Sequence, residues 1–156
     1  MNKNIHLNSD EDYTFIDFTP IAKGKALTKG KISIFARPVR VKNGRRDSAY
    51  NAFRINAVDA AHLQRLGLDM LRLRRDNLTG ELYLVFNSTV GLKLKFEQNA
   101  RSAVIASGEL VEYLANWAGA KPDGNGITRA ELEISDDLSN SPDFATFHIL
   151  RPIDMN

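Results

Sequence analysis

Short runs in which apolar and polar residues alternate recur along most of this chain, and they constrain its fold more than any other feature. In "MLRLRRD" (70–76), apolar side chains at every second position alternate with charged ones. Successive side chains of a β-strand point to opposite faces of a sheet, so this alternation predicts a strand with one buried and one exposed face. Comparable runs predict seven further strands, at residues 31–41, 50–56, 81–87, 91–97, 101–106, 127–135 and 144–150.

Two other segments show the periodicity of an α-helix. In "GELVEYLANWA" (108–118), the apolar residues fall on one side of a helix. Each segment follows a residue that can cap a helix N-terminus and precedes a glycine that can end the helix. The predicted helices and their caps are 57–66 with Asn56 and Gly67, and 108–118 with Ser107 and Gly119.

The dipeptide Asn43-Gly44 is the strongest turn signal in the chain. Both residues tolerate the positive φ angles of a type I′ turn, which joins two antiparallel strands through two residues. The residues that follow, "RRDS" (45–48), are all polar, so a longer loop is also open. Pro38 cannot donate a backbone hydrogen bond, and it predicts an edge or a bulge in the strand at 31–41.

Strands and helices follow one another in the order ββαββ, and this order occurs twice, at about 31–87 and about 91–150. We therefore predict an α+β fold with a mainly antiparallel sheet, built from two tandem ββαββ pseudo-repeats whose helices pack on the sheet. Each half alone is near the size at which one core becomes marginal, so residues 21–156 are expected to form a single domain. Residues 1–20 are expected to form an acidic N-terminal tail.

The composition excludes several classes of protein. The chain has 156 residues, of which 43% are hydrophobic and 26% charged, and this is typical of a soluble globular domain. It has no cysteine, which excludes disulfides and thiolate chemistry. No apolar run has the ~20 residues of a membrane-spanning helix, and the N-terminus does not resemble a signal peptide. We expect a cytoplasmic protein without a membrane partner.

Charge is distributed unevenly along the chain, although the formal net charge is only +2. Residues 21–101 hold 17 Lys and Arg against 6 Asp and Glu, a net charge of +11. Residues 1–20 carry −3 and residues 102–156 carry −6. Such a separation is typical of proteins that bind nucleic acid or a membrane, and it can also reflect pairing within the chain or between subunits.

The alternation also assigns side chains of the predicted strands to faces. In the strand at 70–76, leucines point to one side while Arg72 and Arg74 point to the other. Val39 and Val41 are assigned to the core face in the same way. Applied to all strands of the basic half, this rule predicts a cationic face with one tyrosine, bordered by two arginines from the predicted turn. The residues of this predicted basic face are Arg40, Lys42, Arg45, Arg46, Arg54, Arg72, Arg74, Tyr83, Lys93 and Lys95.

We expect the basic face to bind nucleic acid. Lys and Arg neutralise phosphates and release counterions, and an exposed aromatic ring offers an unpaired base a surface for stacking. The predicted function is largely sequence-independent nucleic-acid binding with a preference for single strands. The alternative is a non-enzymatic protein that self-assembles, because Glu131 and Glu133 occupy on the second repeat the outward positions that Arg72 and Arg74 hold on the first. A homodimer is also expected.

The sequence shows no motif for catalysis or for a cofactor. His6, His62 and His148 are far apart along the chain and lack the spacing of metal ligands. The segment "GKALTKGK" (24–31) contains glycines and lysines but does not match a phosphate-binding loop. We therefore expect no enzymatic activity, no metal site and no cofactor.

Overall fold

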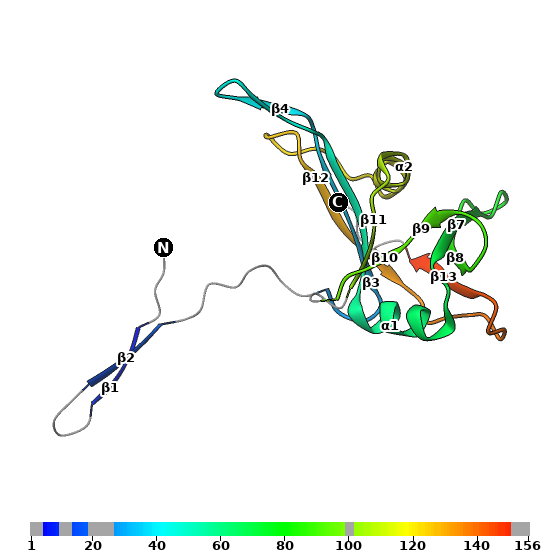
Figure 1. Ribbon diagram of the computed structural model, residues 1–156, viewed down its shortest axis with the longest axis horizontal. Helices are drawn as coiled ribbons and strands as arrows, with labels where there is room; N and C mark the ends of the chain where they lie inside the picture. Colours follow the sequence, from blue (N-terminus) through cyan, green and yellow to red (C-terminus); the bar gives the residue numbers. More distant parts are fainter. Residues whose placement is uncertain (1–4, 10–13, 19–26, 99–101, 151–156) are drawn as a thin grey trace.

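The protein is built mainly from antiparallel β-strands (Figure 1). The computed structural model describes residues 5–9, 14–18, 27–98 and 102–150. Nine strands form one sheet in the order β10-β11-β6-β3-β12-β13-β8-β7-β9, and neighbouring strands are antiparallel throughout. They are β3 (Lys31–Arg37), β6 (Tyr50–Ile55), β7 (Met70–Arg75), β8 (Leu82–Asn87), β9 (Leu92–Lys93), β10 (Lys95–Phe96), β11 (Ala103–Ile105), β12 (Thr128–Ile134) and β13 (Ala145–Leu150).

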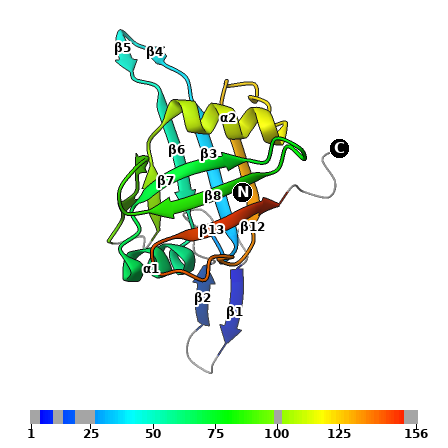
Figure 2. The same ribbon diagram turned by 90° about the vertical axis from the view of Figure 1, so that its right-hand side faces the viewer.

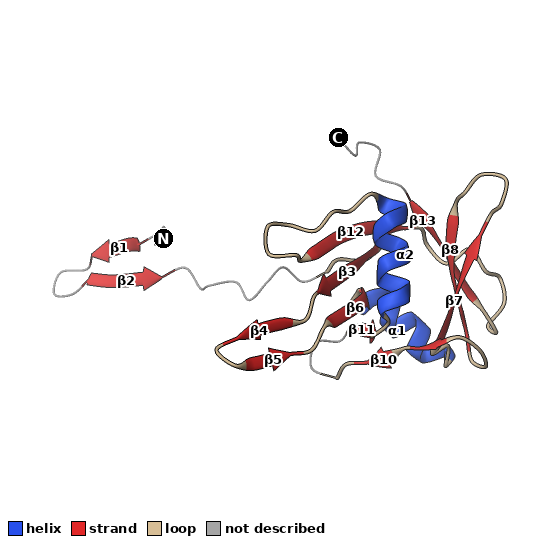
Figure 3. Cartoon of the chain, turned by 90° about the horizontal axis from the view of Figure 1, so that it is seen from above, coloured by secondary structure: helices blue, strands red, loops and turns tan. Residues whose placement is uncertain are grey.

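The sheet curls into a nearly closed barrel because one short segment supplies both of its edges (Figure 3). The edge strands β9 and β10 are separated along the chain by Leu94 alone. Leu94 is 1% exposed, and its backbone N–H donates to the carbonyl of Asp69 over 2.7 Å. The predicted strand at 91–97 is therefore two strands, which bring the edges of the sheet together.

The inward-facing residues of the strands and both helices form one buried core. The helices α1 (Ala57–Leu66) and α2 (Gly108–Ala118) lie at opposite ends of the barrel (Figure 2). Their apolar sides belong to the same buried cluster as the barrel interior, so the helices cover the ends of the barrel. Core residues from the two helices and from the strands include Leu63, Leu110, Leu114, Phe53, Phe86 and Phe147.

The helix boundaries and their caps are confirmed. The Asn56 side chain accepts a hydrogen bond from the backbone N–H of Asp59, and Ser107 accepts one from Leu110. Gly67 and Gly119 end the two helices with φ angles of 70° and 73°, a conformation that costs glycine little. These features depend on residues next to each other in sequence, and for that reason local patterns predict them well.

The predicted α+β fold of two tandem ββαββ pseudo-repeats is wrong. In the sheet, β12 and β13 lie between β3 and β8, while β11 lies beside β6. Strands from the two halves of the chain are thus interleaved, and no internal repeat remains. The helices do not pack side by side on one sheet face, because α2 packs against β3, β6 and β12 while α1 lies at the other end of the barrel (Figure 2).

A two-stranded ribbon projects from the barrel beyond β3 and β6 (Figures 1 and 2). It consists of β4 (Arg40–Lys42) and β5 (Arg45–Asp47), and we call residues 38–49 the arm. Lys42 pairs with Arg45 across Asn43 and Gly44, whose φ angles are 53° and 76°. The predicted turn at Asn43-Gly44 is therefore confirmed, and of the two lengths left open the structure has the shorter one, since residues 45–47 form a strand.

The core-face assignment of Val39 and Val41 is wrong. These side chains are 44% and 74% exposed, because the arm extends past the barrel and has no core on either side. The predicted strand at 31–41 is interrupted at Pro38, which cannot donate to a backbone ladder.

A second hairpin lies within the segment predicted to be a tail. Strands β1 (Ile5–Ser9) and β2 (Thr14–Phe18) pair with each other, with Ile5 opposite Phe18. The predicted boundary near residue 20 lies outside the described residues, so the division into tail and domain stays a prediction.

Candidate nucleic-acid interface

The arm carries four cations within seven residues, Arg40, Lys42, Arg45 and Arg46. Every arm side chain that the structure describes is exposed, including those of Arg40, Arg45 and Arg46. Lys42 lies in the same ribbon, and the only carboxylate between residues 38 and 49 is Asp47. Within the described part of the chain, Arg45 and Arg46 form no ion pair. Arg45 and Arg46 are therefore not neutralised by an ion pair with a described residue, whereas Arg40 lies near the carboxylate of Asp123.

Contacts at the base of the arm hold it against the barrel. The Arg37 guanidinium donates to the carbonyl of Ser48 over 3.4 Å and lies over the Tyr50 ring at 5.8 Å. On the other side, Gly126 packs so closely on Pro38 that an added Cβ would lie 3.2 Å from the Pro38 ring. These contacts connect the two ends of the arm to each other and to a neighbouring loop.

That loop, which precedes β12, is organised by Asp123. Its carboxylate accepts hydrogen bonds from the backbone N–H groups of Ile127 over 3.0 Å and Asn125 over 2.8 Å. These bonds, in that order, are the main reason that the pKa of Asp123 lies below its ordinary value, and the nearby charges of Arg129 and Arg40 lower it further. The Asp123 carboxylate is thus an anion beside the arm, and its hydrogen bonds are all made to backbone groups of the loop.

Two cations of the predicted basic face are paired on the barrel wall. Arg54 on β6 forms an ion pair with Glu97 and donates to the Ser102 hydroxyl over 3.1 Å. Lys93 on β9 forms an ion pair with Asp69. Exposed ion pairs contribute little to stability. Each of these two pairs, however, partly neutralises a cation that could otherwise bind a phosphate.

Tyr83 is enclosed between two side chains from the neighbouring strands. The Arg74 guanidinium on β7 lies 4.7 Å from the centre of its ring. The His148 ring on β13 is stacked at 4.7 Å with an angle of 20° between the planes. Because β8 lies between β7 and β13, Arg74 and His148 cover opposite faces of the tyrosine. Neither face of the Tyr83 ring is open to a nucleobase in this arrangement.

The ten residues of the predicted basic face do not share one surface. Period-2 patterning places Arg72 and Arg74 outward correctly, with Leu71 buried behind them. Lys95, on β10, is also exposed. However, β7 and the arm lie on opposite sides of the molecule (Figures 1 and 3). A flat sheet would align these cations, whereas a barrel wall turns their side chains in different directions.

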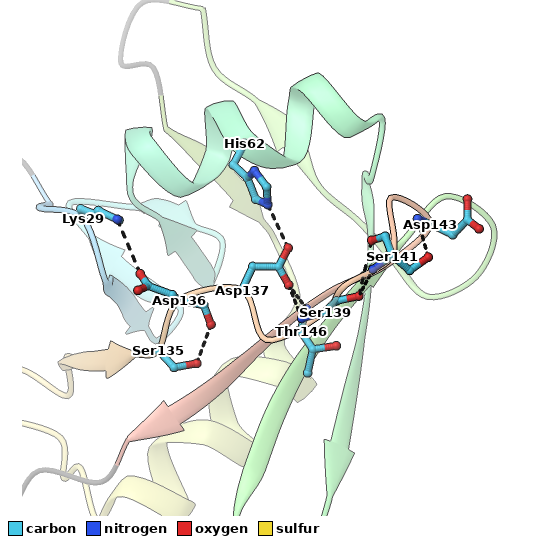
Figure 4. A network of polar contacts seen from close by, with 9 residues as sticks. All are labelled: Lys29, His62, Ser135, Asp136, Asp137, Ser139, Ser141, Asp143 and Thr146. Atoms are coloured by element: carbon cyan, nitrogen blue, oxygen red, sulfur yellow. Dashed lines mark hydrogen bonds and ion pairs between the residues drawn. The ribbon is translucent and has the colours of Figure 1, made fainter.

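A second polar cluster joins α1 to the loop that leads into β13 (Figure 4). His62 Nε2 lies 2.9 Å from Asp137 Oδ2, and Asp137 Oδ1 accepts from the backbone N–H groups of Ser139 and Thr146, both over 2.9 Å. Lys29 pairs with Asp136 at 3.5 Å beside the same small cavity of about 330 Å³. Sequence reasoning missed this cluster, because 75 residues separate His62 from its partner.

The His62–Asp137 pair is best explained as a structural contact. Among the described residues, no hydroxyl is hydrogen-bonded to His62, so the pair lacks the third member of a nucleophilic triad. Within the same residues, no group of three or more His, Cys, Asp and Glu side chains could hold a metal ion. None of the described helices has the length and apolar character needed to cross a membrane.

Comparison with known proteins does not assign the chain to a family. No family model matches it, and no curated protein or solved structure shows significant similarity to it.

Proposed function

We propose that this protein binds nucleic acid through the arm, largely without regard to base sequence. The observation that carries the proposal is the ribbon itself, which projects from the barrel and carries Arg40, Lys42, Arg45 and Arg46 against one aspartate. A cationic element with no core to cover contributes little to folding. The arm is positively charged and lies outside the barrel. It can therefore approach the phosphates of a polyanion without a clash from the barrel.

Phosphate neutralisation is the expected source of affinity. Each cation that contacts a phosphate releases condensed counterions, so affinity falls linearly with salt on a double logarithmic scale. If each of the four arm cations neutralises one phosphate, the slope should be about −3.6 for a DNA duplex and about −2.8 for a single strand. The preference for single strands stays a prediction, and the enclosed ring of Tyr83 gives it no support.

Charge reversal on the arm tests the proposal. The double variant Arg45→Glu, Arg46→Glu should bind any nucleic acid more weakly and reduce the duplex slope to about −1.8, at about −0.9 for each remaining contact. The matched control is Arg72→Glu, Arg75→Glu, which makes the same change of charge on β7, away from the arm. Fluorescence anisotropy at several salt concentrations measures both variants.

The two variants distinguish the arm from the remainder of the barrel. We expect the β7 variant to keep most of the affinity, because its cations face a different direction. Equal losses in both variants would favour a broad basic surface instead of the arm. Wild-type protein that retains no DNA or RNA at low salt would overturn the proposed function.

Self-assembly through opposite charges is the alternative function. It requires Glu131 and Glu133 to meet cations of another subunit, but Glu131 already lies 3.8 Å from Lys31 of its own chain. Sedimentation of the wild type and of Glu131→Arg, Glu133→Arg tests this alternative and the predicted homodimer together. An association that is lost in the variant would support self-assembly, and a monomer at all concentrations would exclude it.

A further inference from the structure

We infer that the arm docks in the major groove of duplex DNA. This inference rests on the proposed function, since it specifies the form of nucleic acid that the arm recognises. It is carried by the dimensions of the ribbon, by the distribution of its side chains over two faces and by its lack of an aromatic residue.

The thickness of the ribbon matches the width of the major groove of DNA and exceeds that of the minor groove. Sheets pack about 10 Å apart, which is the thickness of one sheet with its side chains. The major groove of B-DNA is about 12 Å wide and the minor groove about 6 Å. The arm, with side chains on both faces, therefore fits the major groove and is too thick for an undistorted minor groove.

The length of the ribbon matches the depth of the groove. Strands β4 and β5 have three residues each beyond the barrel, and at about 3.3 Å per residue they extend about 10 Å. The major groove is about 8.5 Å deep. The turn at Asn43 and Gly44 can thus reach the floor of the groove while Arg37 stays at its rim.

The two faces of the arm each carry cationic side chains. Residues opposite each other in an antiparallel pair share a face, so Arg46 lies beside Val41, and Arg45 lies on the opposite face with Arg40. A ribbon inside a groove has a phosphate backbone on either side, and both can be neutralised in this arrangement. Val41, 74% exposed, can contact thymine methyl groups, which are presented in the major groove.

The arm lacks the features that binding to a single strand or to an RNA duplex requires. Residues 38–49 contain no aromatic residue, and stacking on aromatic rings is the main source of single-strand affinity besides charge. Tyr50, at the base, lies under Arg37 and contacts Phe35 edge-on. The major groove of A-form RNA is deep and narrow, so a two-stranded ribbon cannot enter it.

The experiment measures binding of the full chain to a DNA duplex, to each of its single strands and to an RNA duplex of the same sequence. At equal salt, we expect the DNA duplex to bind about tenfold more tightly than the others, the effect of one good base-edge contact. A second DNA duplex carries methyl groups on guanine N7, which lies in the major groove. The added methyl group and its positive charge lie on the floor of the groove, which the turn at Asn43 and Gly44 would reach, so this modification should weaken binding by about tenfold. Netropsin, which occupies the minor groove, should not compete.

The outcomes separate this inference from the proposed function. If duplex DNA is retained but N7 methylation has no effect or netropsin competes, groove docking is overturned and binding by the arm can still stand. Tighter binding to the single strands or to the RNA duplex also overturns the inference. If no nucleic acid is retained, both fail. The Arg45→Glu, Arg46→Glu variant, tested on the same DNA duplex, shows whether the retained binding belongs to the arm.

Discussion

Asp123 illustrates how a single residue can control the loop that supports the arm. Its folded-state pKa lies below the ordinary value of 3.8, chiefly because the N–H groups of Ile127 and Asn125 bond the charged carboxylate. The stabilising contribution is therefore present above pH 3.8 and is lost as the pH falls through the lowered folded pKa. We expect the amide resonances of residues 125 and 127 to shift together in NMR spectra with a midpoint below 3.8.

Two variants serve as controls for Asp123. Asp123→Asn keeps an oxygen acceptor and should abolish the acid transition while the loop remains folded. Asp123→Ala removes the acceptor and should increase amide exchange at residues 125 and 127 at neutral pH. A midpoint at or above 3.8 in the wild type would contradict the assigned role.

Tyr83 is expected to contribute to stability, not to binding. The ring lies between Arg74 and His148, and stacking and cation–π contacts contribute about 0.5–1.5 kcal/mol each in addition to buried area. Tyr83→Ala should therefore lower the free energy of unfolding by about 1–3 kcal/mol, as measured with urea. Tyr83→Phe keeps the ring and should be close to the wild type. Loss of single-strand binding in Tyr83→Ala without loss of stability would contradict this role and support base stacking.

At the scale of the element, the arm depends on its turn. Gly44 has a φ of 76°, and no atom lies within 4 Å of the position that a Cβ would occupy. Gly44→Ala therefore strains the backbone by about 1–2 kcal/mol without a steric clash. Gly44→Asn, which tolerates this conformation better, is the matched control. We expect weaker DNA binding for alanine than for asparagine, with the same thermal unfolding of the barrel, measured by anisotropy and circular dichroism. Equal affinities would show that the shape of the turn is unimportant.

At the scale of the whole molecule, the barrel depends on its seam, by which we mean the place where Leu94 joins the edge strands β9 and β10. Leu94 is 1% exposed between the two edge strands, so Leu94→Ala should destabilise the protein by about 2–5 kcal/mol through lost contacts and a cavity. Leu92→Ala, two residues away at a side chain that is 40% exposed, should have a much smaller effect. Urea denaturation measures both variants. Similar losses would indicate that the seam does not contribute to the core as described.

The sequence alone determined what depends on neighbours along the chain. Both helices, their caps at Asn56 and Ser107 and the turn at Asn43-Gly44 follow from local hydrogen bonding and backbone preference. The period-2 pattern also separated inward from outward side chains on β7 and β8, since the pleat of a strand is the same in a flat sheet and in a barrel.

Tertiary structure alone decided which strands pair and where the outward side chains lie relative to one another. A strand carries no strong local signal for its partner, so β12 could be assigned to a second repeat although it pairs with β3. Closure of the sheet at Leu94 then turned the predicted basic face into a curved wall, while strand pairing brought Arg54 to Glu97 and placed Tyr83 between Arg74 and His148. The arm remained outside that wall, because residues 38–49 have no apolar face long enough to join the core.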